Sequence, residues 1–290
     1  MPLLIFVTIL WAFSFSLIGV YLAGAVDSYF AVLTRLLLAA LVFLPLLRFR
    51  PCPPRTALTL MAIGALQLGL MYLFYYQSFL LLNVPEVLLF TIFTPVYISL
   101  LYDLLEKRFS SWNLCIAALA VLGAAIIRWG RPEGDYWLGF LVVQGANVCF
   151  ALGQVAYKQF MQRQQPLPAR QLFGWFYLGA ALVAALAWLW LGEPQYPQTA
   201  LQWGILLWLG LVASGLGFFL WNKGATQVSA GTLAAMNNAL IPAGLLVNLL
   251  IWNRDADLVR LALGGAVIAA AVIINEWRIR RKREQGKSYG

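Results

Sequence analysis

The sequence lacks histidine, has only three cysteines and carries few charged side chains. Cys52, Cys115 and Cys149 are widely spaced, which matches neither a zinc, haem or iron–sulfur ligand set nor a disulfide framework. Charged residues form 11% of the 290 residues, against about 25% in soluble domains, which is too few to cover a surface in water. We therefore expect neither a metal nor a cofactor, and we exclude an ordinary soluble domain.

Hydrophobic residues make up 62% of the chain, and the mean hydropathy is +0.79. Such a composition is typical of a protein in lipid, where each spanning helix needs about 20 residues. The hydropathy pattern predicts an all-α integral membrane protein with ten transmembrane helices and very short loops. The predicted spans are residues 2–22, 29–47, 58–82, 84–105, 112–127, 136–160, 172–191, 201–221, 232–252 and 258–277. The sequence Asn83-Val84-Pro85 separates the third span from the fourth.

The distribution of basic residues predicts how the helices are oriented. The termini and alternate loops on one side carry fourteen Lys and Arg residues, whereas the loops on the other side carry four. Because basic residues stay on the cytoplasmic side, both termini are expected there, with residues 279–290 forming a basic tail. A basic tail after an apolar helix is typical of contact with membrane lipid. The net charge of +9 therefore does not indicate a nucleic-acid partner.

Two similar segments indicate an internal repeat. Residues 91–95 (TIFTP) in the fourth span correspond to residues 238–242 (NALIP) in the ninth, 147 residues later. Pro95 and Pro242 are predicted to kink these helices and to free backbone carbonyls. The chain would then consist of two five-helix repeats, residues 1–130 and 135–278, and the odd number of crossings makes the second repeat inverted. Chance similarity between two alanine-rich sets of helices is the alternative.

Inverted repeats with paired interruptions are typical of secondary transporters, whose binding sites lie near the bilayer midplane. In such proteins the two repeats exchange conformations, which turns an outward-open cavity into an inward-open one. Small residues in the fifth and tenth spans could also support a homodimer. The sequence therefore favours transport as the function class.

Three charged residues fall within or beside predicted spans. Arg35 lies about six residues into the second span, where it either binds an anionic substrate or is a structural arginine bonded to helix-end carbonyls. Glu86 begins the fourth span, where it either caps the helix or carries a coupled proton. Lys158 lies near the inner end of the sixth span and either extends to the membrane surface or relays charge. Capping is favoured for Glu86 and the structural role for Lys158.

Uncharged polar and aromatic residues are more frequent inside the spans than helix packing requires. Amides mixed with aromatic rings are typical of a pocket that holds a polar ring between flat apolar walls. Hydrogen bonds between helices are the alternative for each residue. No nucleophile elbow, phosphate loop or H-x-E signature is present, so we do not expect an enzyme. The candidate substrate-binding residues are Trp11, Ser14, Arg35, Tyr72, Thr94, Asn147, Trp175, Tyr177, Trp221 and Asn237.

The sequence resembles a known family. The run FAVLTR at residues 30–35, and Pro95 followed by LLEKR at residues 104–108, are similar to the EamA-type drug/metabolite transporters, over nearly the whole chain. One departure is Asn253-Arg254-Asp255, where that family often has another glutamate, so no symmetric role is expected for Glu106. Longer runs at residues 10–16, 26–30, 174–180, 201–206, 237–238 and 242–248 resemble the bacterial biotin transporters of that superfamily.

The resemblance implies a secondary transporter that imports biotin across the bacterial inner membrane by alternating access. It implies a central cavity formed by spans one to four and six to nine. Asn147 and Asn237 would bind the ureido ring of biotin. Arg35, or failing that Lys158, would bind its carboxylate. Coupling to protons or sodium, and uncoupled facilitation, all remain open.

Two other function classes remain as alternatives. The weakly charged aromatic cavity would also suit an exporter of amino acids or other small amphiphilic metabolites. A membrane sensor or an intramembrane enzyme is a second alternative. A sensor should carry a soluble output domain and an enzyme a polar catalytic cluster, and the sequence has neither.

Overall fold

The computed structural model describes residues 2–47, 52–105, 136–163, 168–228 and 230–252, with isolated helical positions between 112 and 122 and between 259 and 281. Every regular element within these ranges is a helix. Lipid offers no hydrogen-bond partners, so the backbone polar groups of a spanning segment must bond within it, as helices allow. The predicted spans 112–127 and 258–277 and the basic tail lie outside the continuous ranges.

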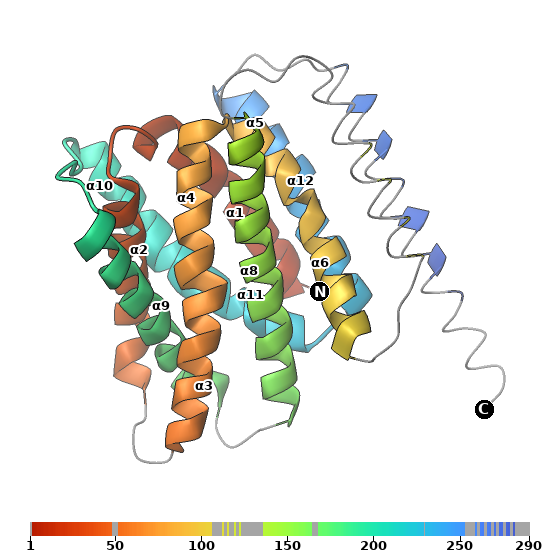
Figure 1. The fold of residues 1–290 in the computed structure, drawn as a ribbon, viewed down its shortest axis with the longest axis horizontal. Coiled ribbons are helices and arrows are strands. Elements are labelled where there is room, and N and C mark those ends of the chain that lie inside the picture. Colours follow the sequence, from red (N-terminus) through yellow and green to blue (C-terminus); the bar gives the residue numbers. More distant parts are fainter. Residues whose placement is uncertain are drawn as a thin grey trace.

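The remaining eight predicted spans coincide with helices, whose ends lie within five residues of those predicted (Figure 1). Several spans combine α-helix with a wider π-helical or a tighter 3₁₀ segment (η). The first four spans consist of α1 (Pro2–Leu17) with η1 (Ile18–Leu22), α2 (Ser28–Phe43) with η2 (Leu44–Leu46), α3 (Pro54–Gly64) with η3 (Ala65–Leu70) and α4 (Met71–Leu81), and α5 (Val84–Phe90) with η4 (Thr91–Phe93) and α6 (Thr94–Leu105). The other four are α8 (Tyr136–Arg163), α9 (Ala169–Leu191), α10 (Ala200–Leu207) with η5 (Trp208–Leu216) and α11 (Gly217–Thr226), and α12 (Ala230–Trp252).

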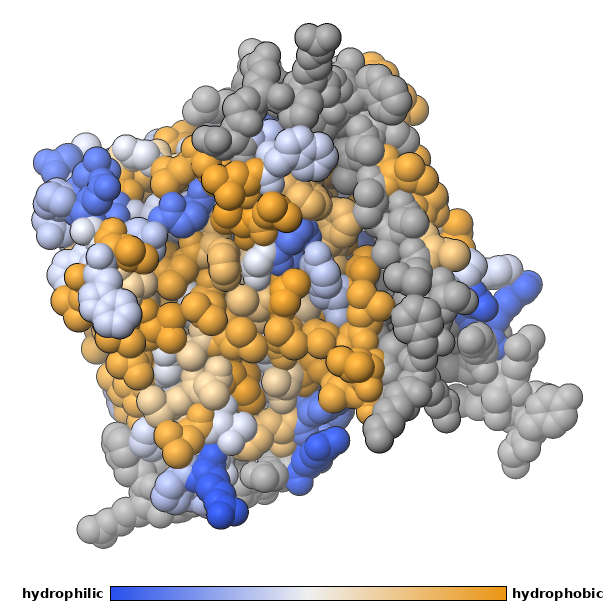
Figure 2. Space-filling model, in the orientation of Figure 1, coloured by the Kyte–Doolittle hydropathy of each residue, from blue (hydrophilic) through white to orange (hydrophobic). Residues whose placement is uncertain are grey.

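The surface of the helices matches a lipid environment. Apolar side chains cover most of the middle of the face seen in Figure 2, and hydrophilic ones gather toward its upper and lower ends. Six stretches among the described residues are long and apolar enough to cross a membrane, and two shorter apolar helices accompany them. The protein is therefore a multi-pass membrane protein. The six are Pro2–Leu22, Ser28–Leu46, Pro54–Leu81, Tyr136–Arg163, Ala169–Leu191 and Ala200–Thr226.

Helices from the two halves of the chain pack directly against each other. α1 packs along α12 and α8 packs along α6, while α2 contacts η5 and α9 contacts η3. Each of these pairs joins an element of residues 2–105 to one of residues 136–252. The space between the halves is consequently lined by both.

Glycine allows the closest of these helix crossings. A Cβ atom added to Gly64 in α3 would lie 1.8 Å from the carbonyl oxygen of Phe176 in α9, and one added to Gly179 would lie 2.0 Å from that of Met61. Without a hydrophobic driving force between helices in lipid, such close backbone contact supplies much of the attraction. α9 is therefore held at a fixed rotation against α3.

The chain breaks between α4 and α5 at the predicted place. The Asn83 side chain accepts a hydrogen bond from the Glu86 backbone N–H (3.0 Å), and the Glu86 carboxylate accepts one from the Asn83 N–H (3.0 Å). This reciprocal capping box satisfies two backbone donors at the start of α5. The capping interpretation of Glu86 is confirmed.

The two predicted proline sites differ in their local structure. Pro95 is the second residue of α6 and follows the 3₁₀ turn η4, in which the Thr94 N–H bonds to Thr91 rather than to Phe90. Proline lacks an N–H, so Pro95 cannot donate a backbone hydrogen bond to a carbonyl of this preceding turn. α12 instead remains helical through Pro242.

Candidate functional site

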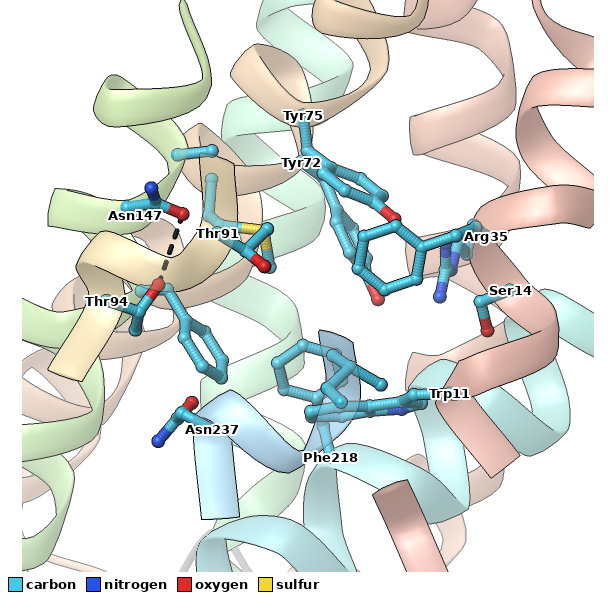
Figure 3. A pocket seen from close by; sticks show the side chains of 15 residues that line it. Trp11, Ser14, Arg35, Tyr72, Tyr75, Thr91, Thr94, Asn147, Phe218 and Asn237 are labelled. Carbon is cyan, nitrogen blue, oxygen red and sulfur yellow. Dashed lines mark hydrogen bonds between the residues drawn. The ribbon is translucent and has the colours of Figure 1, made fainter. Parts of the chain in front are cut away.

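A cavity between the two halves contains seven of the ten candidate substrate-binding residues (Figure 3). Its empty volume, counted with its opening, is about 630 Å³. Side chains from α1, α2, α4, η4, α6, α8, α11 and α12 form its wall. The seven predicted residues are Trp11, Ser14, Arg35, Tyr72, Thr94, Asn147 and Asn237, and the others are Phe15, Met71, Tyr75, Thr91, Ala146, Phe150, Phe218 and Leu240.

Arg35 provides the charge at one end of the cavity. It is 2% exposed, its Nε donates to Ser214 Oγ (2.5 Å), and Nη1 donates to the Tyr76 hydroxyl (3.4 Å). Its guanidinium carbon lies 4.3 Å from the centroid of the Tyr72 ring. All of these partners are neutral, and a buried charge without a counter-charge costs several kcal/mol. An anionic group of a ligand in the cavity would offset this cost.

The hydroxyl of Ser14 is a further polar group of the cavity wall, and Figure 3 draws it on the same side of the cavity as Arg35. Ser14 is 4% exposed, and its Oγ has no hydrogen-bond partner among the described residues. A buried hydroxyl that lacks a partner is destabilising unless a bound molecule supplies one. This end of the cavity therefore offers both an unpaired charge and an unpaired hydroxyl.

The opposite side of the cavity is built on the break before α6. The carbonyl of Phe90, the residue that precedes η4, accepts a hydrogen bond from Asn147 Nδ2 (2.7 Å). The same amide nitrogen donates to Gln144 Oε1 (3.1 Å), and Thr94 Oγ1 donates to Asn147 Oδ1 (3.1 Å; Figure 3). The hydrogens of Asn147 and Thr94 are thus directed at protein acceptors, which leaves the lone pairs of Thr94 Oγ1 and the second lone pair of Asn147 Oδ1 for a ligand.

Asn237 and Thr91 extend this pattern. Asn237 Nδ2 donates to Gln154 Oε1 (3.2 Å) and to the Leu233 carbonyl (2.8 Å), which leaves Oδ1 as its acceptor. The Thr91 hydroxyl donates to the Leu88 carbonyl (2.6 Å). This side of the cavity presents acceptors and would bind a group that carries N–H donors.

Aromatic rings form the wall between the two polar sides. The centroid of the Trp11 ring lies 4.5 Å from that of Phe218 and 6.3 Å from that of Phe150. Trp11 Nε1 donates to the carbonyl of Ala213 (2.8 Å), which fixes the plane of the indole. The ring of Phe15 meets that of Tyr75 edge to face at 5.3 Å. The cavity can therefore hold a small amphiphile with a compact apolar body, an anionic end and a donor-rich end.

Comparison with known proteins gives the family. The sequence profile described as the EamA-like transporter family matches residues 1–129 and again residues 137–276. The chain belongs to the EamA-like transporter family.

Several curated relatives of this EamA-like transporter are similar over almost their whole length. A Pseudomonas aeruginosa protein named "Probable biotin transporter" is 60% identical over 277 residues, which cover 95% of this chain and 97% of the relative. Proteins named "Biotin transporter" from Salmonella typhimurium and Escherichia coli K12 are each 54% identical, over 95% of this chain and 92% of theirs. A solved crystal structure, 19% identical, aligns with a TM-score of 0.71 over 97% of this chain and 98% of its own. At that identity the structural match shows the fold alone.

Three predicted residues of this EamA-like transporter do not line the cavity. Trp221 is 1% exposed and lies behind the Trp11 ring, at 4.9 Å between centroids. The Tyr177 hydroxyl donates to carbonyls of η5, and Trp175 is partly buried on α9 beside Cys52. α9 turns these two side chains toward α2, η5 and the loop before α3. Their residue type suggested a pocket, but the rotation of the helix directs them elsewhere.

The two possible charge-relay residues also lie outside the cavity wall. Glu86 is part of the cap of α5. Lys158 is 5% exposed, and its Nζ donates to the carbonyl of Val228 (2.6 Å), after the end of α11. The Glu86 carboxylate bonds within the cap of its own helix, whereas Lys158 joins α8 to the residues after α11.

Eight wall residues were not among the candidates, although two of them belong to features that the sequence analysis singled out. Thr91 belongs to the segment that matches residues 238–242, and Tyr75 is one of several polar residues of the third span. Phe15, Phe150 and Phe218 give no such signal, because an apolar ring in a spanning helix suits both lipid and the protein interior.

Proposed function

We propose that this EamA-like transporter imports biotin across the bacterial inner membrane. The observation that carries the proposal is a buried arginine whose partners among the described residues are all neutral, at one end of an aromatic cavity and opposite a side that presents acceptors. The names of the relatives from three bacteria support the same substrate.

The chemical groups of biotin complement the cavity. Its valerate is anionic at neutral pH and would bind the guanidinium of Arg35. Its ureido ring has two N–H donors, for which the oxygens of Thr94 and Asn237 are suitable acceptors. The thioether ring of biotin is apolar and would pack on the apolar face of the Trp11 indole.

We also propose that ten spans form two inverted repeats, residues 1–130 and 135–278, that alternate between outward-open and inward-open states. The family profile matches twice, at residues 1–129 and 137–276. The packing of α1 on α12 is equivalent to that of α8 on α6, and α2 on η5 is equivalent to α9 on η3. The π-helical segments η3 and η5 also occur at about the same depth in the third and eighth spans.

Charged residues at the helix ends support an orientation with both termini in the cytoplasm. Among the described residues, Arg55, Arg163, Arg170 and Lys223 lie at ends that this orientation directs inward. Asp27, Glu86 and Glu193 lie at ends that it directs outward. Basic residues are enriched in cytoplasmic loops.

Uptake of tritiated biotin at nanomolar concentration tests the proposal, in cells deprived of their own biotin transporter. We expect saturable uptake that depends on this protein and that unlabelled biotin competes away. If the protein is present in the membrane and no uptake occurs, biotin is the wrong substrate, and export of other small amphiphiles should be screened next.

A further inference from the structure

Ser214 lies outside the cavity wall but contacts the residues that form its charged end. It is fully buried in η5, in the middle of the eighth span. Its Oγ accepts a hydrogen bond from Arg35 Nε (2.5 Å) and forms a second hydrogen bond with the Tyr72 hydroxyl (2.9 Å). Ser214 thus links two cavity residues that come from different helices, α2 and α4.

The hydrogen bonds of Arg35 determine which of its N–H groups are left for a ligand. Nε is occupied by Ser214, and one hydrogen of Nη1 is directed at Tyr76. A guanidinium has five N–H donors in a rigid plane, so both hydrogens of Nη2 and one of Nη1 remain. The Cζ atom lies over the Tyr72 ring, and the remaining donors, all on Nη1 and Nη2, are the ones that the oxygens of a carboxylate can bind.

The position of Ser214 is itself held by its surroundings. The wide turns of a π-helix depart from regular α-helical bonding and are often found at functional sites. Three carbonyls of η5 accept hydrogen bonds from side chains of other helices. The Tyr177 hydroxyl donates to those of Ser214 (2.6 Å) and Gly215 (2.8 Å), and Trp11 Nε1 donates to that of Ala213 (2.8 Å). Tyr177 in α9 therefore holds the turn that presents Ser214 to Arg35.

We propose that Ser214, held by Tyr177, is a positioning residue that directs the free edge of the Arg35 guanidinium at the carboxylate of the substrate. The proposal rests on the proposed function, because it needs an anionic substrate in the cavity. It makes Ser214 and Tyr177 determinants of selectivity for the free acid over neutral analogues, although neither lines the cavity.

The test measures binding of tritiated biotin to the purified transporter in detergent, and its displacement by unlabelled biotin or by neutral biotinamide. Ser214→Ala removes the oxygen that orients Arg35. We expect it to weaken biotin about tenfold, as for loss of a hydrogen bond to a charged group, and to leave biotinamide nearly unchanged. Ser78→Ala is the matched control, because the buried Ser78 hydroxyl bonds only to its own helix, at the Tyr75 carbonyl.

Tyr177→Phe is a second variant that removes one hydroxyl and keeps the ring. It should also reduce the preference for biotin over biotinamide, by a smaller factor than Ser214→Ala does. This variant keeps the test available if Ser214→Ala does not fold. Equal weakening of both ligands, or an unchanged preference in the folded variants, would overturn the positioning role. Failure of the unmodified transporter to bind biotin would instead refute the proposed function, so the two failures are distinguishable.

Discussion

Replacement of Arg35 by methionine is the most direct perturbation of the site. Methionine has a similar length but no charge and no N–H donors, so the substrate carboxylate would lose its partner. Removing one member of a buried, hydrogen-bonded charge pair costs about 2–5 kcal/mol. At 1.4 kcal/mol for each factor of ten, Arg35→Met should weaken biotin binding roughly 30-fold to 4,000-fold.

The structure gives an opposite expectation for the protein without substrate. Arg35 is buried with hydroxyls and an aromatic ring as partners, so its charge is a cost until an anion binds. Arg35→Met should therefore be at least as resistant to thermal unfolding in detergent as the unmodified protein. This outcome separates loss of binding from loss of folding.

Thermal shift measurements with and without biotin assay both effects. A ligand at 100 times its Kd stabilises a protein by about 2.7 kcal/mol, and after a 100-fold loss of affinity the same concentration gives only about 0.4 kcal/mol. Arg35→Lys keeps the charge but loses the planar donor edge. Its stabilisation by biotin should lie between that of the unmodified protein and that of Arg35→Met. Biotinamide serves as the neutral control and should lose little affinity in either variant.

The reasoning about Arg35 is refuted by either of two results. One is Arg35→Met protein that binds biotin within about threefold of the unmodified protein, which is less than one charge-assisted hydrogen bond is worth. The other is an equal loss of affinity for biotin and biotinamide.

Three further predictions concern the acceptor side, the cap of α5 and the helix packing. Thr94→Val removes one acceptor worth about 1 kcal/mol and should weaken biotin and biotinamide equally, by roughly fivefold, in the same displacement assay. Glu86→Gln keeps the capping box, in which glutamine replaces glutamate well. Biotin uptake by this variant should therefore equal uptake by the unmodified protein, both with and without a protonophore. A loss of uptake in the variant would restore Glu86 as a proton carrier. Gly179→Ala would place a methyl group 2.0 Å from the Met61 carbonyl oxygen and should lower stability by about 1–3 kcal/mol or more, measured by thermal unfolding. Gly204→Ala, which meets no atom within 4 Å, should fold as the unmodified protein does, and equal stability of the two variants would contradict the packing argument.

The positions of the helices could be predicted from the order of residues alone. A spanning segment must be apolar along its length and must satisfy its own backbone, so hydropathy locates it without knowledge of its neighbours. The break before Glu86 was equally local, because the cap involves Asn83 and Glu86 within one turn. Arg35 stood out because a charge inside an apolar span is costly wherever the helix packs.

The composition of the cavity wall was only partly predictable, since it depends on the rotation of each helix. Trp11 and Trp175 are the same residue type and both lie inside predicted spans, yet of the two only Trp11 lines the cavity. Gly64 and Gly179 bring α3 and α9 into backbone contact and so set the face that α9 presents. Local sequence determines where a helix runs, but its rotation follows from packing with segments far away in the chain.

Residue order alone therefore predicted a multi-pass helical membrane protein with a cation, Arg35, well inside its second span, and a family resemblance. The packed helices were needed to show that Arg35 has neutral partners, that the threonine and asparagine hydrogens across the cavity are already used, and that Ser214 and Tyr177 form hydrogen bonds behind Arg35. Hydrogen-bond direction depends on atoms from several helices meeting at distances near 3 Å, and no pattern along a single helix contains that information.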